Sequence, residues 1–145
     1  MRINPCSIVA SDSQLRDSYI KYTVNLDPKD LNASKCNCTW CQKRNFIAIS
    51  LKDPENEFKL VAPKSKDDID DYNPKTEATE AGIGDGHRWF CAKCGCHVWG
   101  EGLYKFGDTK YDHFSINLGT IDQPQDGIDV SETKVTYIDG LHNNW

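Results

Sequence analysis

The first regular alternation of apolar and polar positions follows a polar, irregular stretch that covers residues 1–17. In residues 19–26, aromatic and β-branched side chains recur at every second position, which is typical of a strand with one buried face. Asp27, Pro28 and Asp30 come next and have the chemistry of a turn. The pattern therefore predicts a first strand over residues 19–26 and a turn directly after it.

Short runs rich in Val, Ile, Phe and Trp predict further strands along the rest of the chain. These runs cover residues 46–51, 58–61, 87–90, 98–100, 114–118 and 134–138. There is no internal repeat and no convincing amphipathic helix, and a length of 145 residues suits one domain with its own core. We therefore expect a mainly β fold and a single domain over residues 1–145.

Two polar segments invite a functional interpretation that their details do not support. Residues 67–71 hold four aspartates, but they lack the glycine and the final glutamate of an EF-hand, so we expect a solvated loop. Residues 82–86 contain three glycines, but no Lys-Ser/Thr pair follows as in a phosphate-binding loop. We expect a flexible turn there.

Three cysteines, Cys36, Cys38 and Cys41, lie within six residues of one another, and we call this segment the first cysteine loop. A C-x-C-x-x-C loop can supply three thiolates to one ion, and catalytic zinc is typically held by three protein ligands with one position left open. The spacing therefore predicts a zinc site at these three residues, between two strands.

The second cysteine loop, residues 91–96, contains Cys91, Cys94 and Cys96. Its C-x-x-C-G pattern is that of a metal-binding knuckle, in which Gly95 allows the positive φ of a tight turn. We expect a hairpin across this loop and name Cys91 and Cys94 as further metal ligands. Cys96 and His97 are adjacent, so on a strand they point to opposite faces and do not form a nucleophilic pair.

Composition and charge exclude several classes of function. The net charge of −5 argues against a nucleic-acid partner, which would favour a basic stripe. No segment is apolar and long enough for a secretory signal or a membrane span, so we expect a cytoplasmic protein. Seven cysteines are an odd number, and all but Cys6 have metal-type spacing, which in a reducing compartment favours metal ligation over disulfides.

Basic and aromatic residues beside the first cysteine loop are candidates for substrate binding. Three thiolates and one Zn²⁺ sum to one negative charge, so Lys35, Lys43 and Arg44 would stabilise the thiolates and could hold an anionic substrate. A solvated basic face is the alternative. Trp40, and with it Trp89, Phe90 and Trp99, could line a pocket, although large aromatic residues more often belong to the core. His97 and His113 are acid/base candidates for which a structural role is the more common outcome.

Four segments together resemble one known family, the glutathione-dependent formaldehyde-activating enzymes grouped with centromere protein V. The segments are the first cysteine loop with Lys43 and Arg44 behind it, the R-x-F-C-x-x-C-G block from Arg88 to Gly95, the run over residues 114–122 and the closing Asn144-Trp145. The resemblance implies a β-rich domain of folded-over antiparallel sheets pinned by zinc. It also implies a catalytic zinc at the first loop and a structural zinc at the second, shared with an early C-x-C pair.

The chain departs from this pattern near its amino terminus. Leu15 and Asp17 stand where the family has the two early cysteines, so Cys91 and Cys94 lack their usual partners. Asp17, Cys6, Cys96 or His97 could complete a site, the two loops could share one zinc, or the second loop could be free of metal. The number of zinc ions, one or two, stays open at this point.

The resemblance implies a zinc-dependent, lyase-type enzyme that forms or breaks a carbon–sulfur bond. Its substrate would be a small electrophile or thiol adduct, with glutathione or another thiol as partner and with Zn²⁺ as cofactor. Cys36, Cys38 and Cys41 would be catalytic, and Trp40, Lys43 and Arg44 would bind substrate. The alternative is a non-catalytic, zinc-pinned binding module of the centromere protein V kind, and the acidic charge favours the enzyme.

Overall fold

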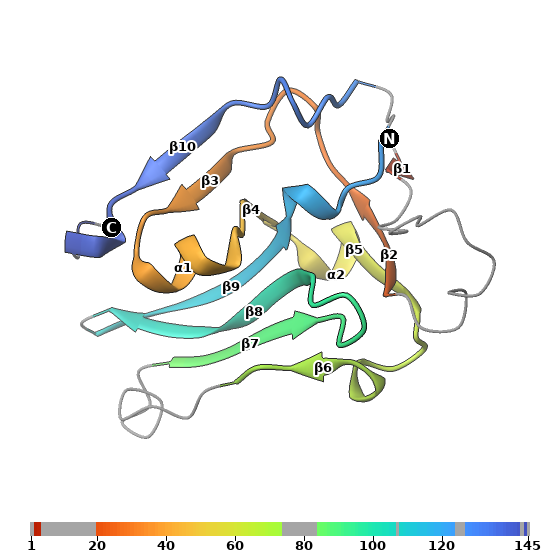
Figure 1. Cartoon of the computed structure of the whole chain (residues 1–145), viewed down its shortest axis with the longest axis horizontal. Helices are drawn as coiled ribbons and strands as arrows, with labels where there is room; N and C mark the ends of the chain where they lie inside the picture. Colours follow the sequence, from red (N-terminus) through yellow and green to blue (C-terminus); the bar gives the residue numbers. More distant parts are fainter. Residues whose placement is uncertain are drawn as a thin grey trace.

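The computed structural model describes residues 2–3, 20–73, 84–106, 108–123, 127–142 and 144 and arranges their strands in two sheets (Figure 1). The smaller sheet has the order β1-β2-β5, formed by Arg2–Ile3, Lys21–Asn25 and Phe58–Ala62. The larger sheet has the order β10-β3-β4-β9-β8-β7-β6, formed by Val135–Ile138, Ala33–Cys36, Ala48–Ser50, Thr109–Asn117, His97–Phe106, Gly84–Phe90 and Asp70–Asp71. All pairs are antiparallel except β10 with β3, which is parallel.

Helices are short in the described part of the chain. They are α1 (Thr39–Arg44), α2 (Pro54–Glu57) and three 3-10 turns, Lys66–Asp68, Leu118–Thr120 and Gly140–His142. No helix among the described residues has both the length and the apolar character that crossing a membrane requires.

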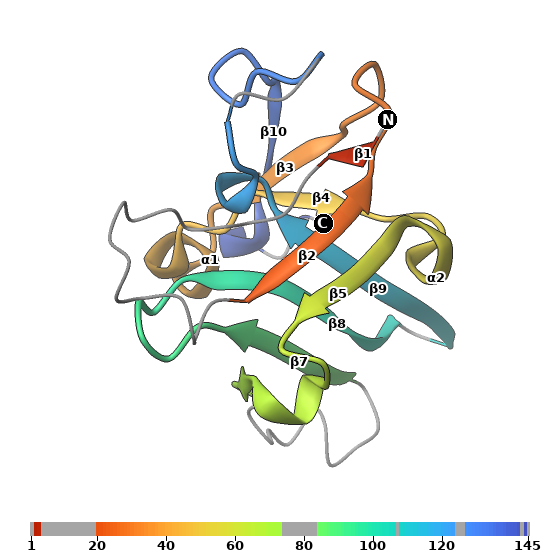
Figure 2. The same ribbon diagram turned by 90° about the vertical axis from the view of Figure 1, so that its right-hand side faces the viewer.

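A row of aromatic rings joins the two sheets. In Figure 2, β2 and β5 lie in front of the larger sheet, and their Tyr22 and Phe58 stack with centroids 5.1 Å apart. Phe58 then meets Trp99 of β8 at 5.3 Å, and Trp99 stacks on Trp89 of β7 at 5.6 Å. Trp99 and Tyr22 are almost fully buried, so this row forms the centre of the core.

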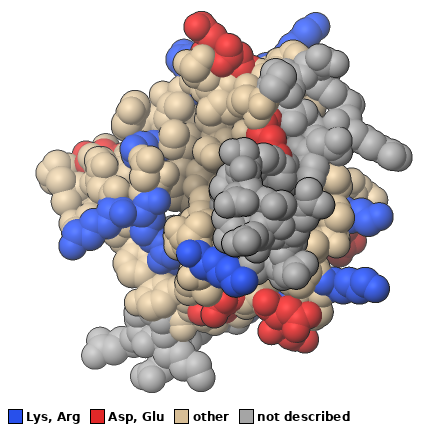
Figure 3. Space-filling view, turned by 45° about the vertical axis from the view of Figure 1, so that its right-hand side comes forward, with Lys and Arg blue, Asp and Glu red and all other residues tan. Residues whose placement is uncertain are grey.

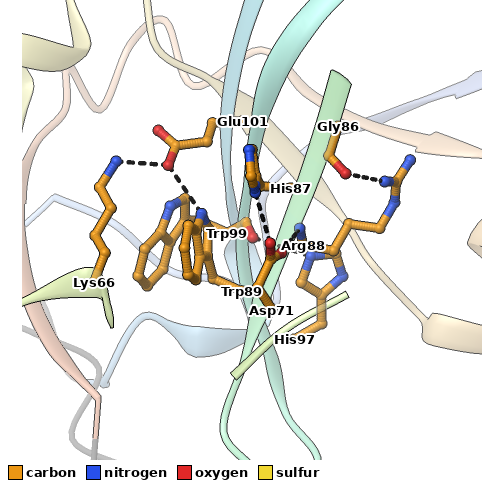
Figure 4. Close-up of polar contacts among 9 residues, drawn as sticks. All are labelled: Lys66, Asp71, Gly86, His87, Arg88, Trp89, His97, Trp99 and Glu101. Atoms are coloured by element: carbon orange, nitrogen blue, oxygen red, sulfur yellow. Dashed lines mark hydrogen bonds and ion pairs between the residues drawn. The ribbon is translucent and has the colours of Figure 1, made fainter. Parts of the chain in front are cut away.

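The opposite face of β7 and β8 carries a different set of side chains, because neighbouring residues on a strand point to opposite faces. Figure 4 shows Trp89 and Trp99 stacked on one side of these strands and Arg88 on the other. Gly100 pairs with Arg88 across the ladder, and Gly86 pairs with Gly102. On this face the helix α1 approaches, since the Arg88 guanidinium lies over the Trp40 ring at 5.3 Å. Gly100 has no side chain on this face and lines a cavity together with Trp40 and Arg88.

The predicted mainly β fold is confirmed, and most predicted strands lie where the pattern places them. The strand expected over residues 19–26 is β2, and those over residues 58–61 and 134–138 are β5 and β10. The run over residues 46–51 forms a strand only at residues 48–50, and the hairpin across the second cysteine loop is much longer than predicted.

Three features differ from the predictions. Gly84, Asp85 and Gly86 are not a turn but the start of β7, because β8 offers them a full antiparallel partner; Gly82 and Ile83 lie outside the described residues. Asp70 and Asp71 are likewise not a loop but the edge strand β6. The strand β3 was missed, because only Ala33 of its four residues is buried and it shows no apolar alternation.

The aromatic row predicts a large loss of stability when its central ring is removed. Trp99→Ala should lower the free energy of unfolding by about 3–5 kcal/mol, the usual cost of deleting a large buried side chain. Tyr137→Ala is the control, since Tyr137 is 71% exposed on β10 and should change stability by no more than about 0.5 kcal/mol. Urea denaturation followed by circular dichroism measures both, and a loss below about 1 kcal/mol for Trp99→Ala would contradict this account of the core.

Candidate metal centre

The first cysteine loop brings its three sulfur atoms together at the point where β3 passes into α1. Cys36 ends β3, Cys38 is the N-cap of α1, and Cys41 lies in its first turn. Their Sγ atoms all lie within 4.8 Å of one another. Two sulfurs bound to one tetrahedral zinc at about 2.3 Å are roughly 3.8 Å apart, so the three thiols fit such an ion with little adjustment.

Backbone amides of the helix start hold the sulfurs in place. The amide of Cys41 donates to Cys38 Sγ at 3.5 Å, and the amide of Cys38 donates to Cys36 Sγ at 3.4 Å. The helix then ends at Asn45, whose φ of 48° is left-handed. The loop geometry is therefore local: a strand end, a cap and a single short helix place all three thiols.

Crowding shifts the pKa values of Cys38 and Cys41 in opposite directions. Burial raises the pKa of Cys38, but hydrogen bonds from Cys41, Cys36 and Trp40 outweigh it and leave this pKa below the ordinary value. Burial raises the pKa of Cys41 to about 12, together with hydrogen bonding and charge from Cys38 and Cys36. A cation between the sulfurs would lower the thiol pKa values instead, since metal ligation deprotonates thiols outright.

The second cysteine loop forms the expected tight turn but no comparable cluster. Gly95 adopts a φ of 72°, its amide donates to the carbonyl of Cys91 at 2.6 Å, and the Cys91 amide donates to the carbonyl of Cys96 at 2.9 Å. Cys91 is buried and Cys94 is exposed. Among the described residues, the first cysteine loop alone brings three potential ligand atoms within 4.8 Å. Cys6 and Asp17, proposed as partners for the second loop, lie outside the described residues.

The two loops do not share a four-cysteine site in the structure. Within the described part of the chain, no sulfur of the second loop and no nitrogen of His97 joins the three sulfurs at that distance. The first loop therefore offers three ligands and leaves a tetrahedral ion one position short.

A small cavity adjoins the metal centre between α1 and the larger sheet. Its volume is about 120 Å³, and its lining includes Trp40, Cys41, Arg44, Arg88, His97 and Gly100. A more open groove of about 380 Å³ shares Trp40 and Arg44 with this cavity and is lined also by Tyr72, Phe90 and Gly95. Cys41 is thus both a member of the sulfur cluster and part of the cavity wall.

Two arginines meet around one indole ring at this cavity. The Arg44 guanidinium carbon lies 4.9 Å from the Trp40 ring centroid, and that of Arg88 lies 5.3 Å from it. Tyr72 stacks on Trp40 at 5.0 Å and extends the aromatic surface. Burial lowers the pKa of Arg44, and the charge of Arg88 lowers it further. The arrangement concentrates positive charge beside Cys41.

Neither arginine has a carboxylate partner among the described residues, where the ion pairs are formed by other groups. Arg88 donates through Nη1 to the carbonyl of Gly86 at 2.7 Å (Figure 4). The nearby carboxylate of Asp71 accepts instead from His87 Nδ1 at 2.6 Å and from the Arg88 amide at 2.8 Å.

Two histidines of the cavity wall, His97 and His113, have lowered pKa values and are neutral at pH 7. Burial lowers the pKa of His97 to about 4, aided by the charges of Arg44 and Arg88. Its Nε2 donates to the carbonyl of Trp99 at 3.1 Å, its ring stacks on Phe46 at 4.3 Å, and its Nδ1 has no hydrogen-bond partner among the described residues. Burial likewise lowers the pKa of His113, with the charge of Arg88 as second cause. At neutral pH, His97 and His113 therefore add no positive charge to that of the two arginines.

Only some of the residues predicted to bind substrate line the cavity. Trp40 and Arg44 line the cavity, whereas Lys43 is exposed and is absent from the lining of both hollows. Lys35 turns to Asn45, whose Oδ1 accepts from its Nζ at 2.7 Å. Arg88, Tyr72 and Gly100 were not predicted as site residues; Arg88 carried a signal only through its place in the R-x-F-C block.

A larger hollow of about 780 Å³ lies elsewhere, between residues 28–33 and 127–136. Its described lining contains neither cysteine nor histidine. Two of its acids have partners nearby, since Asp30 pairs with Lys52 and Asp129 accepts from Ser131. Size alone therefore does not make it the functional site.

Positive and negative side chains are both present on the face that Figure 3 shows, where Lys and Arg lie among Asp and Glu. The concentrated positive charge lies instead in the cavity wall beside the sulfurs.

Comparison with known proteins supports the fold and the family. A crystal structure of a Rhodobacter sphaeroides protein superposes with a TM-score of 0.52 at 15% identity, covering 81% of this chain and 91% of that one, which shows a shared fold. No curated protein matches the sequence significantly. The glutathione-dependent formaldehyde-activating enzyme family matches residues 18–136, which include both cysteine loops and the cavity wall. The chain therefore belongs to the family of glutathione-dependent formaldehyde-activating enzymes.

Proposed function

We propose that the protein is a zinc-dependent, lyase-type enzyme that joins a thiol to a small carbonyl compound or releases the two from their adduct. The observation that carries this proposal is the sulfur cluster of Cys36, Cys38 and Cys41, which offers three ligands and leaves one position open beside a cavity. A structural zinc would need a fourth protein ligand, and the described residues supply none at that distance.

The cysteine cluster suits zinc because soft thiolates select this ion, and the amides of Cys38 and Cys41 already donate to the sulfurs. When bound, zinc supplies a Lewis acid that polarises a carbonyl group and stabilises a thiolate at neutral pH. The chain contributes the rest. Arg44 and Arg88 hold negative charge next to the reacting atoms, and Trp40 lines both the cavity and the open groove.

The reaction needs no oxidant or reductant. The thiol sulfur forms a bond to the carbonyl carbon, the π pair of the carbonyl moves to its oxygen, and the thiol proton ends on that oxygen. Release is the reverse. Fixed guanidinium groups favour this chemistry, because they offer hydrogen bonds to the developing oxygen without giving up a proton to it.

Metal content is the first test. Purified protein should carry about one zinc per chain, and Cys38→Ser should bind zinc at least 100-fold more weakly, a loss beyond the 10–100-fold typical of outer-sphere changes. Cys94→Ser is the matched control, since Cys94 is exposed and outside the cluster, and it should keep its zinc. Elemental analysis showing no zinc in protein prepared without chelator, or zinc lost equally in both variants, would contradict the assignment.

Turnover is the second test. Cys38→Ser should abolish adduct formation between glutathione and formaldehyde, followed as the loss of free thiol, because the open position disappears with the metal. Its far-ultraviolet circular dichroism should stay that of the wild type, so that loss of fold is excluded. Wild-type activity in Cys38→Ser would remove the support for a catalytic zinc, and a wild-type protein that binds zinc but accelerates no thiol–carbonyl reaction would favour the non-catalytic binding module.

A further inference from the structure

Two positive charges at the cavity have no carboxylate partner. Arg44 and Arg88 lie around the Trp40 ring, and no described carboxylate forms an ion pair with either. The nearby carboxylate of Asp71 accepts from His87 Nδ1 and from the Arg88 amide instead. The two guanidinium groups therefore lie unpaired in a partly enclosed site, where an unpaired charge is costly. A bound anion would supply the missing partner.

Guanidinium groups recognise planar anions best. Their N–H donors match the two oxygens of a carboxylate, and such charge-assisted pairs are roughly twice as strong as neutral hydrogen bonds. Arg88 is already oriented by its bond to the Gly86 carbonyl, and Arg44 by stacking on Trp40. Preorganised donors of this kind lose little freedom when an anion binds.

The volume of the cavity limits the size of its occupant. A dry cavity of about 150 Å³ holds benzene, which has six heavy atoms. By that scale the cavity of about 120 Å³ next to Cys41 holds about five heavy atoms, which excludes a tripeptide thiol. The open groove of about 380 Å³, which shares Trp40 and Arg44 with the cavity, has room for the larger reactant.

Glycine at position 100 is part of the same arrangement. A Cβ built there would lie 3.4 Å from the His87 carbonyl oxygen and 3.9 Å from His97 Nε2, which are ordinary contacts. Gly100 does not adopt a positive φ, so its backbone does not require glycine. The position lines the cavity, so a side chain there would take volume from the occupant.

We propose that this cavity binds the carboxylate of a small 2-oxo acid between Arg44 and Arg88, and that such an acid is preferred to an uncharged aldehyde as the carbonyl substrate. This inference rests on the proposed function. The carboxylate is held by the arginines, and the adjacent carbonyl group lies in the part of the cavity lined by Cys41. Addition of the thiol forms the carbon–sulfur bond, and its proton passes to the former carbonyl oxygen, which gives a 2-hydroxy-2-thio acid.

Isothermal titration calorimetry with pyruvate on the zinc-containing protein tests the site directly. Pyruvate should bind at least tenfold more tightly than pyruvamide, which has the same shape without the charge. Arg44→Gln and Arg88→Gln should each weaken pyruvate binding at least tenfold, and Gly100→Ala should also weaken it by filling the cavity. Lys59→Gln removes one positive charge from the smaller sheet and should bind pyruvate like the wild type.

Several results would overturn the inference. These are no pyruvate binding at millimolar concentration, equal binding of pyruvamide, full affinity in Arg44→Gln, or sulfate competing as strongly as pyruvate, which would mark a general anion site. Turnover measured in parallel separates the two proposals. Rapid reaction of thiols with formaldehyde but no pyruvate binding would overturn the 2-oxo acid alone, whereas arginine-dependent pyruvate binding without any thiol turnover would overturn the enzymatic function and leave the carboxylate site.

Discussion

Three thiols within 4.8 Å of one another cannot all ionise unless a cation lies between them. In this protein the crowding is imposed by local structure, because Cys36, Cys38 and Cys41 occupy a strand end, a helix cap and the first helical turn. Without a cation, burial and the neighbouring cysteines raise the pKa of Cys41 to about 12, so this thiol keeps its proton. This chemistry supports the proposed metal centre, and Cys41 also lines the cavity in which we propose that the substrate binds.

The sheets place this centre by using the two faces of the same strands for different tasks. On one face, Trp89 and Trp99 stack into the aromatic row that fastens the smaller sheet to the larger one. On the other face, Arg88 reaches the ring of Trp40 and Gly100 leaves space for a ligand. Stability and binding are thus coupled through strand register, since a slip by one residue would exchange the two faces.

Sequence reasoning recovered the features that depend on local patterns. The β-rich fold follows from short alternating runs, and the sulfur cluster follows from C-x-C-x-x-C spacing, which brings three side chains together whatever the rest of the chain does. The sequence did not indicate that Arg44 lines the cavity while Lys43 points to solvent. Helix α1 has only six residues, too few to show a period, and a turn of about 100° per residue sends one side chain to solvent and the next into the cavity.

Features that depend on distant pairing also escaped prediction. Arg88, Gly100 and Tyr72 reach the site only because β7 pairs with β8 and with β6 next to α1.

The central claim is that zinc at the first cysteine loop keeps one position open. X-ray absorption at the zinc edge of the resting protein tests it most directly. Three sulfurs at about 2.3 Å with one lighter atom at about 2.0 Å is the predicted shell, and four sulfurs at about 2.3 Å would contradict it.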